Sequence, residues 1–179
     1  MPSSLHTDLW ATIAAEAGQE SPLWGAALRP EAARESVPVF SPLGEERFKL
    51  GLETIYEGYL LHFGRPRLFA PADDDTAILV GDYLYAHGLV RVAAFEEVEA
   101  VADLAELISL CSQLQADGRE GDGEAWAATA ALLGLGGLDE ARAALRLEGD
   151  PRPLGALARG AAGDEAVERS LAAHRLRLR

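Results

Sequence analysis

Residues 73–94, D-D-D-T-A-I-L-V-G-D-Y-L-Y-A-H-G-L-V-R-V-A-A, carry the clearest structural signal in the chain. Three acidic residues end a polar loop, and a run that is apolar on nearly every face follows them. A helix with so little polar surface is expected to lie inside other helices. We therefore expect a buried central helix over residues 76–94. Asp82 and His87 would lie on it at a depth where an unpaired charge is costly.

Glycines, prolines and helical periodicity divide the rest of the chain. Thr7 is expected to cap a short amphipathic helix that ends at Gly18. After a Pro-rich arm, the periodicity predicts helices over residues 48–63, 95–117, 124–133, 139–147, 154–161 and 164–176. The closing R-L-R-L-R is expected to be a fraying helix end.

No segment is a strong strand candidate, so the pattern predicts an all-α fold. We expect one helical domain over residues 1–179. Within it, residues 1–44 form the N-terminal helix and the arm, residues 45–134 form the core helices, and residues 135–179 form short C-terminal helices.

Composition limits the classes of partner. The net charge of -13 over 179 residues argues against nucleic acid and anionic membranes, which need a basic surface, and suits a basic protein surface. Cys111 is the single cysteine, so no intrachain disulfide forms, and it is expected to be a small core residue. No apolar run approaches ~20 residues and no signal peptide pattern begins the chain, so we expect a cytoplasmic protein without a membrane span.

The loop before residue 76 holds the first candidate site residues. Asp73, Asp74 and Asp75 are clustered carboxylates, which suit a divalent cation. We favour the alternative that one of them caps the helix and the others interact with its dipole. Arg65 and Arg67 have the chemistry to bind a diphosphate through bidentate contacts, but we favour the alternative that they are solvated loop residues.

The remaining polar residues have mainly structural interpretations. Asp82 is expected to form a hydrogen bond to a neighbouring helix or, alternatively, to contact a ligand near a central cavity. His62 is expected to cap a helix C-terminus, and His174 to lie on the surface. Trp24 is expected to pack on its own domain, the alternative being a contact with another subunit. The sequence contains no G-x-S-x-G, H-E-x-x-H or C-x-x-C motif.

Three segments resemble the trans-isoprenyl diphosphate synthases. T-A-I-L-V-G-D-Y-L-Y-A, residues 76–86, resembles the helix that follows the first aspartate-rich motif of those enzymes. C-S-Q-L-Q-A-D-G, residues 111–118, resembles the end of their next helix, and W-A-A-T-A-A-L-L-G, residues 126–134, resembles a segment that usually reads K-T-A-A-L-F. The three segments span roughly the middle half of the chain, and the resemblance implies a truncated terpenoid-synthase-like helical bundle.

The chain departs from the family where the family carries its chemistry. An ungapped alignment puts Glu53, Thr54 and Glu57 on the first aspartate-rich motif and residues 62–63 on the diphosphate-binding arginine pair. An alternative alignment puts residues 63–64 on the first two aspartates. The second aspartate-rich motif has no counterpart. Because ionising an allylic diphosphate needs metal ions and cationic side chains, we do not expect this chain to do so alone.

In lacking these motifs, the chain resembles the small subunits of heterodimeric synthases, which are all-helical and lack the aspartate-rich motifs. That resemblance implies a non-catalytic subunit that needs no cofactor, binds a full-length polyprenyl diphosphate synthase and modulates chain elongation; a homo-oligomer stays open. The first alternative is a Mg²⁺-dependent prenyl diphosphate-binding protein or prenyltransferase, with an unusual metal site from Glu53, Glu57, Asp73, Asp74 and Asp75. The second alternative is a helical interaction domain without a ligand.

Overall fold

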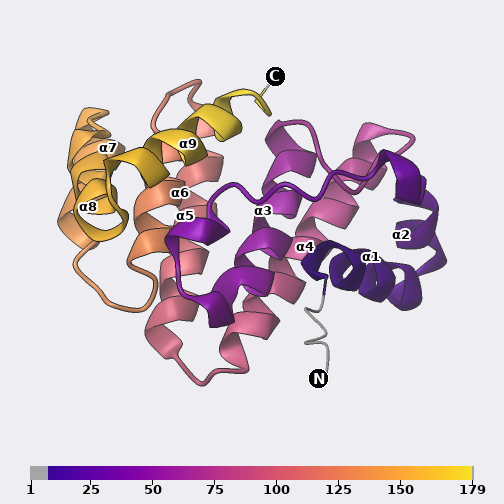
Figure 1. Cartoon of the computed structure of the whole chain (residues 1–179). Coiled ribbons are helices and arrows are strands. Elements are labelled where there is room, and N and C mark those ends of the chain that lie inside the picture. The colour runs from indigo at the N-terminus through magenta and orange to yellow at the C-terminus, as the bar shows by residue number, and fades with distance from the viewer. Residues whose placement is uncertain (1–7, 179) are drawn as a thin grey trace, which may run out of the picture.

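The computed structural model describes residues 8–178, and within them the secondary structure is helical apart from isolated bridges (Figure 1). This confirms the predicted all-α, single-domain fold. The α-helices are α1 (Leu9–Glu20), α2 (Pro22–Ala27), α3 (Lys49–Phe63), α4 (Asp74–Ala93), α5 (Val98–Ala116), α6 (Asp122–Ala131), α7 (Asp139–Glu148), α8 (Arg152–Ala162) and α9 (Asp164–Arg175). Short 3-10 turns lie in the arm at Glu31–Ala33, Ser41–Leu43 and Glu46–Phe48.

Local capping signals explain where the early helices begin. The Asp8 carboxylate accepts a hydrogen bond from the Trp10 amide at 3.0 Å and starts α1. The predicted cap, Thr7, lies outside the described residues. The helix continues past Gly18 to Glu20, contrary to the prediction, and Ser21 then caps α2.

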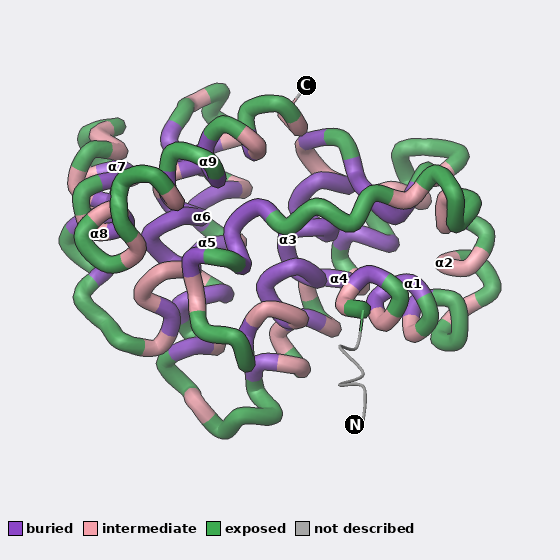
Figure 2. Tube along the Cα trace, in the orientation of Figure 1, coloured by how far each residue is buried: buried purple, intermediate pink, exposed green. Residues whose placement is uncertain are grey.

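Helix α3, and not α4, lies at the centre of the fold. Every residue from 51 to 61 is buried, and the tube of α3 is coloured as buried over most of its length in Figure 2. Helix α4 buries only one side, formed by Val80, Gly81, Leu84, Gly88 and Val92. The prediction of a fully buried helix over residues 76–94 is therefore wrong, because the apolar residues of α4 lie on its solvent side as well as on its packed side.

Small residues bring α3 and α4 into close contact. A Cβ atom added to Gly58 on α3 would lie 2.9 Å from the carbonyl oxygen of Gly81 on α4. A Cβ added to Gly81 would in turn lie 2.6 Å from His62 Nε2. The glycines therefore let the two helix backbones approach more closely than larger side chains would permit.

The interior consists of two apolar clusters. The larger one surrounds α3, α5 and α6 and extends to α9, with Trp126 among its fully buried side chains and the predicted core residue Cys111 within it. The smaller one joins α1 to α4 and to the loop after α3. Trp24 packs beside it and stacks on Tyr83 of the same chain, as predicted, with ring centroids 5.6 Å apart.

The loop of residues 64–70 is held between two distant parts of the chain. On one side, the Arg29 amide donates to the Leu68 carbonyl, and the Ala70 amide donates to the Ala27 carbonyl, both at 2.8 Å. On the other side, the Arg65 amide donates to the Arg177 carbonyl at 2.8 Å, beside a bridge between residues 64 and 178. The Leu176 and Arg177 amides still donate to Ala172 and His174, as at the predicted helix end, but the described residues there also pair with the loop instead of fraying.

None of the helices in the described part of the chain has both the length and the apolar character needed to cross a membrane.

Candidate functional site

The structure joins three predicted site residues in one buried ion cluster. Arg67 donates to Glu53 Oε2 at 2.6 Å and to Glu57 Oε2 at 2.9 Å, and all three side chains are buried. Glu57 Oε1 also accepts hydrogen bonds at 2.7 Å from the backbone amides of Arg67 and Leu68. The two carboxylates on α3 therefore neutralise an arginine from the loop, which folds back across them.

This cluster is a structural junction. Burial alone would lower the pKa of Arg67. The charges and hydrogen bonds of Glu53 and Glu57 outweigh this effect and raise the pKa. The guanidinium also lies 4.5 Å from the centre of the Trp10 ring on α1 and donates to the Val37 carbonyl of the arm at 2.8 Å. The interpretations of Arg67 as a diphosphate ligand or a solvated loop residue are both wrong, since its side chain is enclosed by partners.

The carboxylates considered as metal ligands are not grouped together in the described chain. Asp73 caps α4, as we favoured, by accepting from the Thr76 amide at 2.7 Å, and that hydrogen bond lowers the pKa of Asp73. Asp74 and Asp75 lie in the first turn of α4. Within residues 8–178, no three His, Cys, Asp or Glu side chains are placed to share a metal ion.

Asp82 lies on the surface rather than in the interior. Its side chain is 65% exposed, and its Oδ1 lies 3.2 Å from His62 Nε2 on α3. Desolvation lowers the pKa of His62, although the Asp82 carboxylate partly opposes this. The prediction of a buried charge on α4 is therefore wrong, because Asp82 lies on the solvent side of this helix. The favoured polar contact with a neighbouring helix is nevertheless present, since Asp82 pairs with His62 on α3.

A second polar network was missed by the sequence reasoning. His174 on α9 lies 2.8 Å from the Tyr56 hydroxyl through Nδ1 and 3.0 Å from Asp122 Oδ2 through Nε2, and Asp122 also accepts from the Tyr59 hydroxyl. Burial alone would raise the pKa of Asp122. The hydrogen bond and the charge of His174 outweigh this effect, so the pKa of Asp122 is lowered.

This network fastens α9 to α3 and α6. The prediction of a surface His174 is wrong, since the residue is buried. The helical periodicity of α9 could have predicted this burial. His174 lies three, four and seven residues after Leu171, Ser170 and Val167, which form the buried side of that helix.

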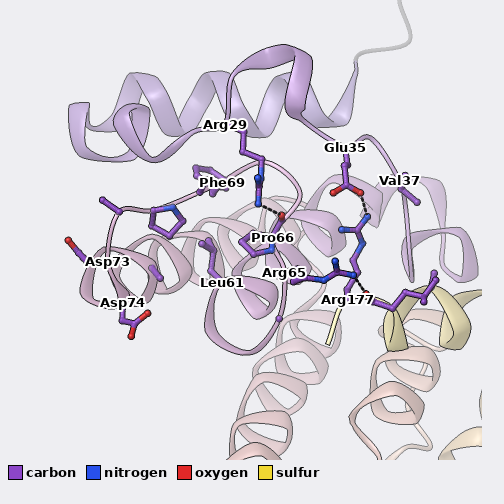
Figure 3. Close-up of a pocket in the computed structure, with 17 residues that line it drawn as sticks. Arg29, Glu35, Val37, Leu61, Arg65, Pro66, Phe69, Asp73, Asp74 and Arg177 are labelled. Carbon is purple, nitrogen blue, oxygen red and sulfur yellow. Dashed lines mark hydrogen bonds and ion pairs between the residues drawn. The ribbon is translucent and has the colours of Figure 1, made fainter. Parts of the chain in front are cut away.

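A pocket of about 820 Å³ opens where the arm, loop 64–70 and the residues after α9 meet (Figure 3). Arg29, Arg65 and Arg177 line it together with Glu35. The exposed Arg65 donates to the Leu176 carbonyl at one edge. Of the two arginines considered for diphosphate binding, Arg65 is exposed, as favoured for a solvated loop residue, and it also lines this pocket.

The outward side of α4 forms an exposed apolar strip. We name this the α4 strip. It comprises Ile78, Leu79, Ala86, Val90 and Ala93, with Asp82 as its charged member. Leu79 is 51% exposed and Val90 is 65% exposed. Beyond the turn into α5, Val98 is 77% exposed. Because residues at these spacings lie on one side of a helix, they present a continuous surface.

No protein-family model, curated protein or solved structure matches this chain, so the resemblance to isoprenyl diphosphate synthases stays a prediction.

Proposed function

We propose that this chain is a non-catalytic subunit that binds a full-length polyprenyl diphosphate synthase through the α4 strip and modulates prenyl chain elongation. The observation that carries the proposal is the outward direction of apolar side chains on α4, the helix whose residues 76–86 resemble the synthases. Large exposed apolar residues on one helix face are typical of a protein interface. In this proposal the chain acts in the cytoplasm and needs no cofactor of its own.

The charges around the α4 strip favour a different chain over a second copy as the occupant. Asp75, Glu96 and Glu99 lie at its ends and form no ion pair within residues 8–178, and Asp82 lies on the strip itself. Two copies would therefore bring acidic residues together in a chain that already carries a net charge of -13. A partner with a basic rim around an apolar groove complements this surface.

The buried cluster supports a non-catalytic role. Glu53 and Glu57 occupy the positions that an ungapped alignment gives to metal-binding aspartates, and both accept hydrogen bonds from Arg67. A metal ion bound to either carboxylate would lie beside the buried guanidinium of Arg67, and the repulsion between the two cations would oppose its binding.

Co-expression with a polyprenyl diphosphate synthase tests the proposal. The wild-type chain is expected to co-purify with the synthase and to change the length of its product. Leu79→Asp, which places a charge within the interface, should weaken the complex by about tenfold or more. Leu147→Asp is the matched control, because Leu147 is 80% exposed but lies on α7.

Three outcomes contradict this function. The first is a complex that Leu79→Asp and Leu147→Asp affect equally. The second is self-association through the α4 strip in place of binding to the synthase. The third is condensation of isopentenyl diphosphate with an allylic diphosphate by the purified chain and Mg²⁺ alone.

A further inference from the structure

Three arginines from three separate segments converge at the pocket beside loop 64–70. Arg29 comes from the arm, Arg65 from the loop, and Arg177 from the segment after α9. Arg177 donates to Glu35 Oε2 at 2.6 Å. That hydrogen bond lowers the pKa of Glu35 against the effect of burial, and the charges of Arg177, Arg29 and Arg65 lower it further. All three guanidinium groups therefore lie close enough to act on one carboxylate.

This end of the pocket is positive in an otherwise acidic chain. Three guanidinium charges face the single carboxylate of Glu35, whereas the whole chain carries a net charge of -13. The other acidic residues of the lining, Asp73 and Asp74, lie at the opposite end in Figure 3. A local positive field in a concave site concentrates anions from solution.

The arginines retain hydrogen-bonding capacity. Arg29 donates to the Pro66 carbonyl at 3.3 Å, and its buried Nε has no hydrogen-bond partner among the described residues. Arg65 donates to the Leu176 carbonyl. Neither arginine forms an ion pair with a carboxylate within residues 8–178. Because guanidinium groups bind oxyanions more strongly than neutral carbonyls, a second anion would improve their bonding.

The wall beside these arginines is apolar. Val37 and Leu176 line the pocket and are 46% and 72% exposed, whereas Leu61 and Phe69, which also line it, are buried. Figure 3 shows Leu61, Pro66 and Phe69 between the arginines and the two aspartates. Pockets of several hundred cubic ångströms with apolar walls and a few convergent polar groups are typical of small-molecule sites.

We propose that this pocket binds a small amphiphilic anion, whose phosphate or carboxylate head contacts Arg29 and Arg65 and whose apolar part lies against Val37 and Leu176. Glu35 is the internal counter-ion of the site and competes with the head group for the arginines. The proposal is independent of the interface on α4, since the pocket shares no residue with the α4 strip.

Titration calorimetry on the full chain tests the site, with hexyl phosphate, hexanoate and inorganic phosphate as probes at low ionic strength. At least one of the two amphiphiles is expected to bind, and the comparison between them shows which head group the arginines prefer. Inorganic phosphate, which has no apolar part, should bind about tenfold more weakly than hexyl phosphate.

Charge variants identify the residues that recognise the head group. Arg65→Gln should weaken binding by about tenfold, and Glu35→Gln should strengthen it by a similar factor. Arg152→Gln is the control, because it removes the same charge from an exposed residue of α8 that pairs with Asp150. Circular dichroism confirms that each variant is folded, and a gain of affinity in Glu35→Gln cannot arise from unfolding.

The proposal is overturned if neither amphiphile binds. It is also overturned if Arg65→Gln binds as tightly as Arg152→Gln, or if Glu35→Gln binds no more tightly than the wild type.

Discussion

Gly51 on α3 and Gly88 on α4 face each other so closely that a Cβ atom added to Gly88 would lie 3.1 Å from the Gly51 carbonyl oxygen. The same Cβ would lie 2.3 Å from Ile55 Cγ1. Gly58 and Gly81 form a second close approach on the same pair of helices. The contact between the central helix and α4 therefore depends on the absence of side chains at these positions.

Replacing Gly88 is expected to destabilise the fold. The substitution Gly88→Ala should lower the free energy of unfolding by ~1–3 kcal/mol, because overpacking at Ile55 outweighs the ~1 kcal/mol that alanine adds in helix propensity. Urea denaturation measures the difference. The control is Gly160→Ala on α8, where a Cβ atom would meet nothing within 4 Å, so this variant should gain up to ~1 kcal/mol. Equal stability of the two variants would contradict the close approach.

Removing the buried arginine is expected to be more severe. The substitution Arg67→Met leaves Glu53 and Glu57 buried without their cation, at a cost of ~3–5 kcal/mol in the free energy of unfolding. The triple variant Arg67→Met, Glu53→Gln, Glu57→Gln should recover part of this loss, because no unpaired charge remains. Arg169→Met breaks an exposed pair with Glu165 and should cost below ~0.5 kcal/mol. Thermal unfolding of all three variants measures these differences. If Arg67→Met lost no more stability than Arg169→Met, the cluster would have no structural role.

Acidification is expected to destabilise the protein in two steps. Burial holds the pKa of His62 below its usual value, so the unfolded chain binds this proton more readily and stability falls as the pH drops below about 6.5. The lowered pKa of Asp122 acts later, since its stabilisation is present above about pH 4 and is lost as the pH falls through the folded pKa. In a plot of the free energy of unfolding against pH, His62→Gln should remove only the first step. If the first step were unchanged, a group other than His62 would be responsible for it.

Much of the fold was predictable because its signals are local. The cap at Asp73 begins α4 where expected, and the glycines and prolines after residue 117 separate α6 to α9 within a few residues of their predicted bounds. Depth in the fold was harder to predict. Helix α4 is apolar yet exposed on one side, whereas α3 is buried although it carries Glu53 and Glu57.

Contacts between distant parts of the chain decide which helix is buried, and they also limited the prediction of the site. Glu53 and Glu57 can be buried only because Arg67, from a loop that folds back on α3, lies against both of them. Nothing in the spacing of the sequence indicates that return of the chain. The arginine pocket likewise joins residues 29, 65 and 177, and such distant positions have no local pattern in common.

The pairing of loop 64–70 with the segment after α9 has a consequence for synthesis on the ribosome. The arm that supplies backbone partners to the loop is synthesised before the loop itself. By contrast, Arg177 lies 112 residues after its partner Arg65 in the sequence and is synthesised much later. At typical translation rates this is an interval on the order of ten seconds. During it, the side of α3 that α9 covers stays open to the cell, and this corner of the molecule completes its folding only after translation has passed α9.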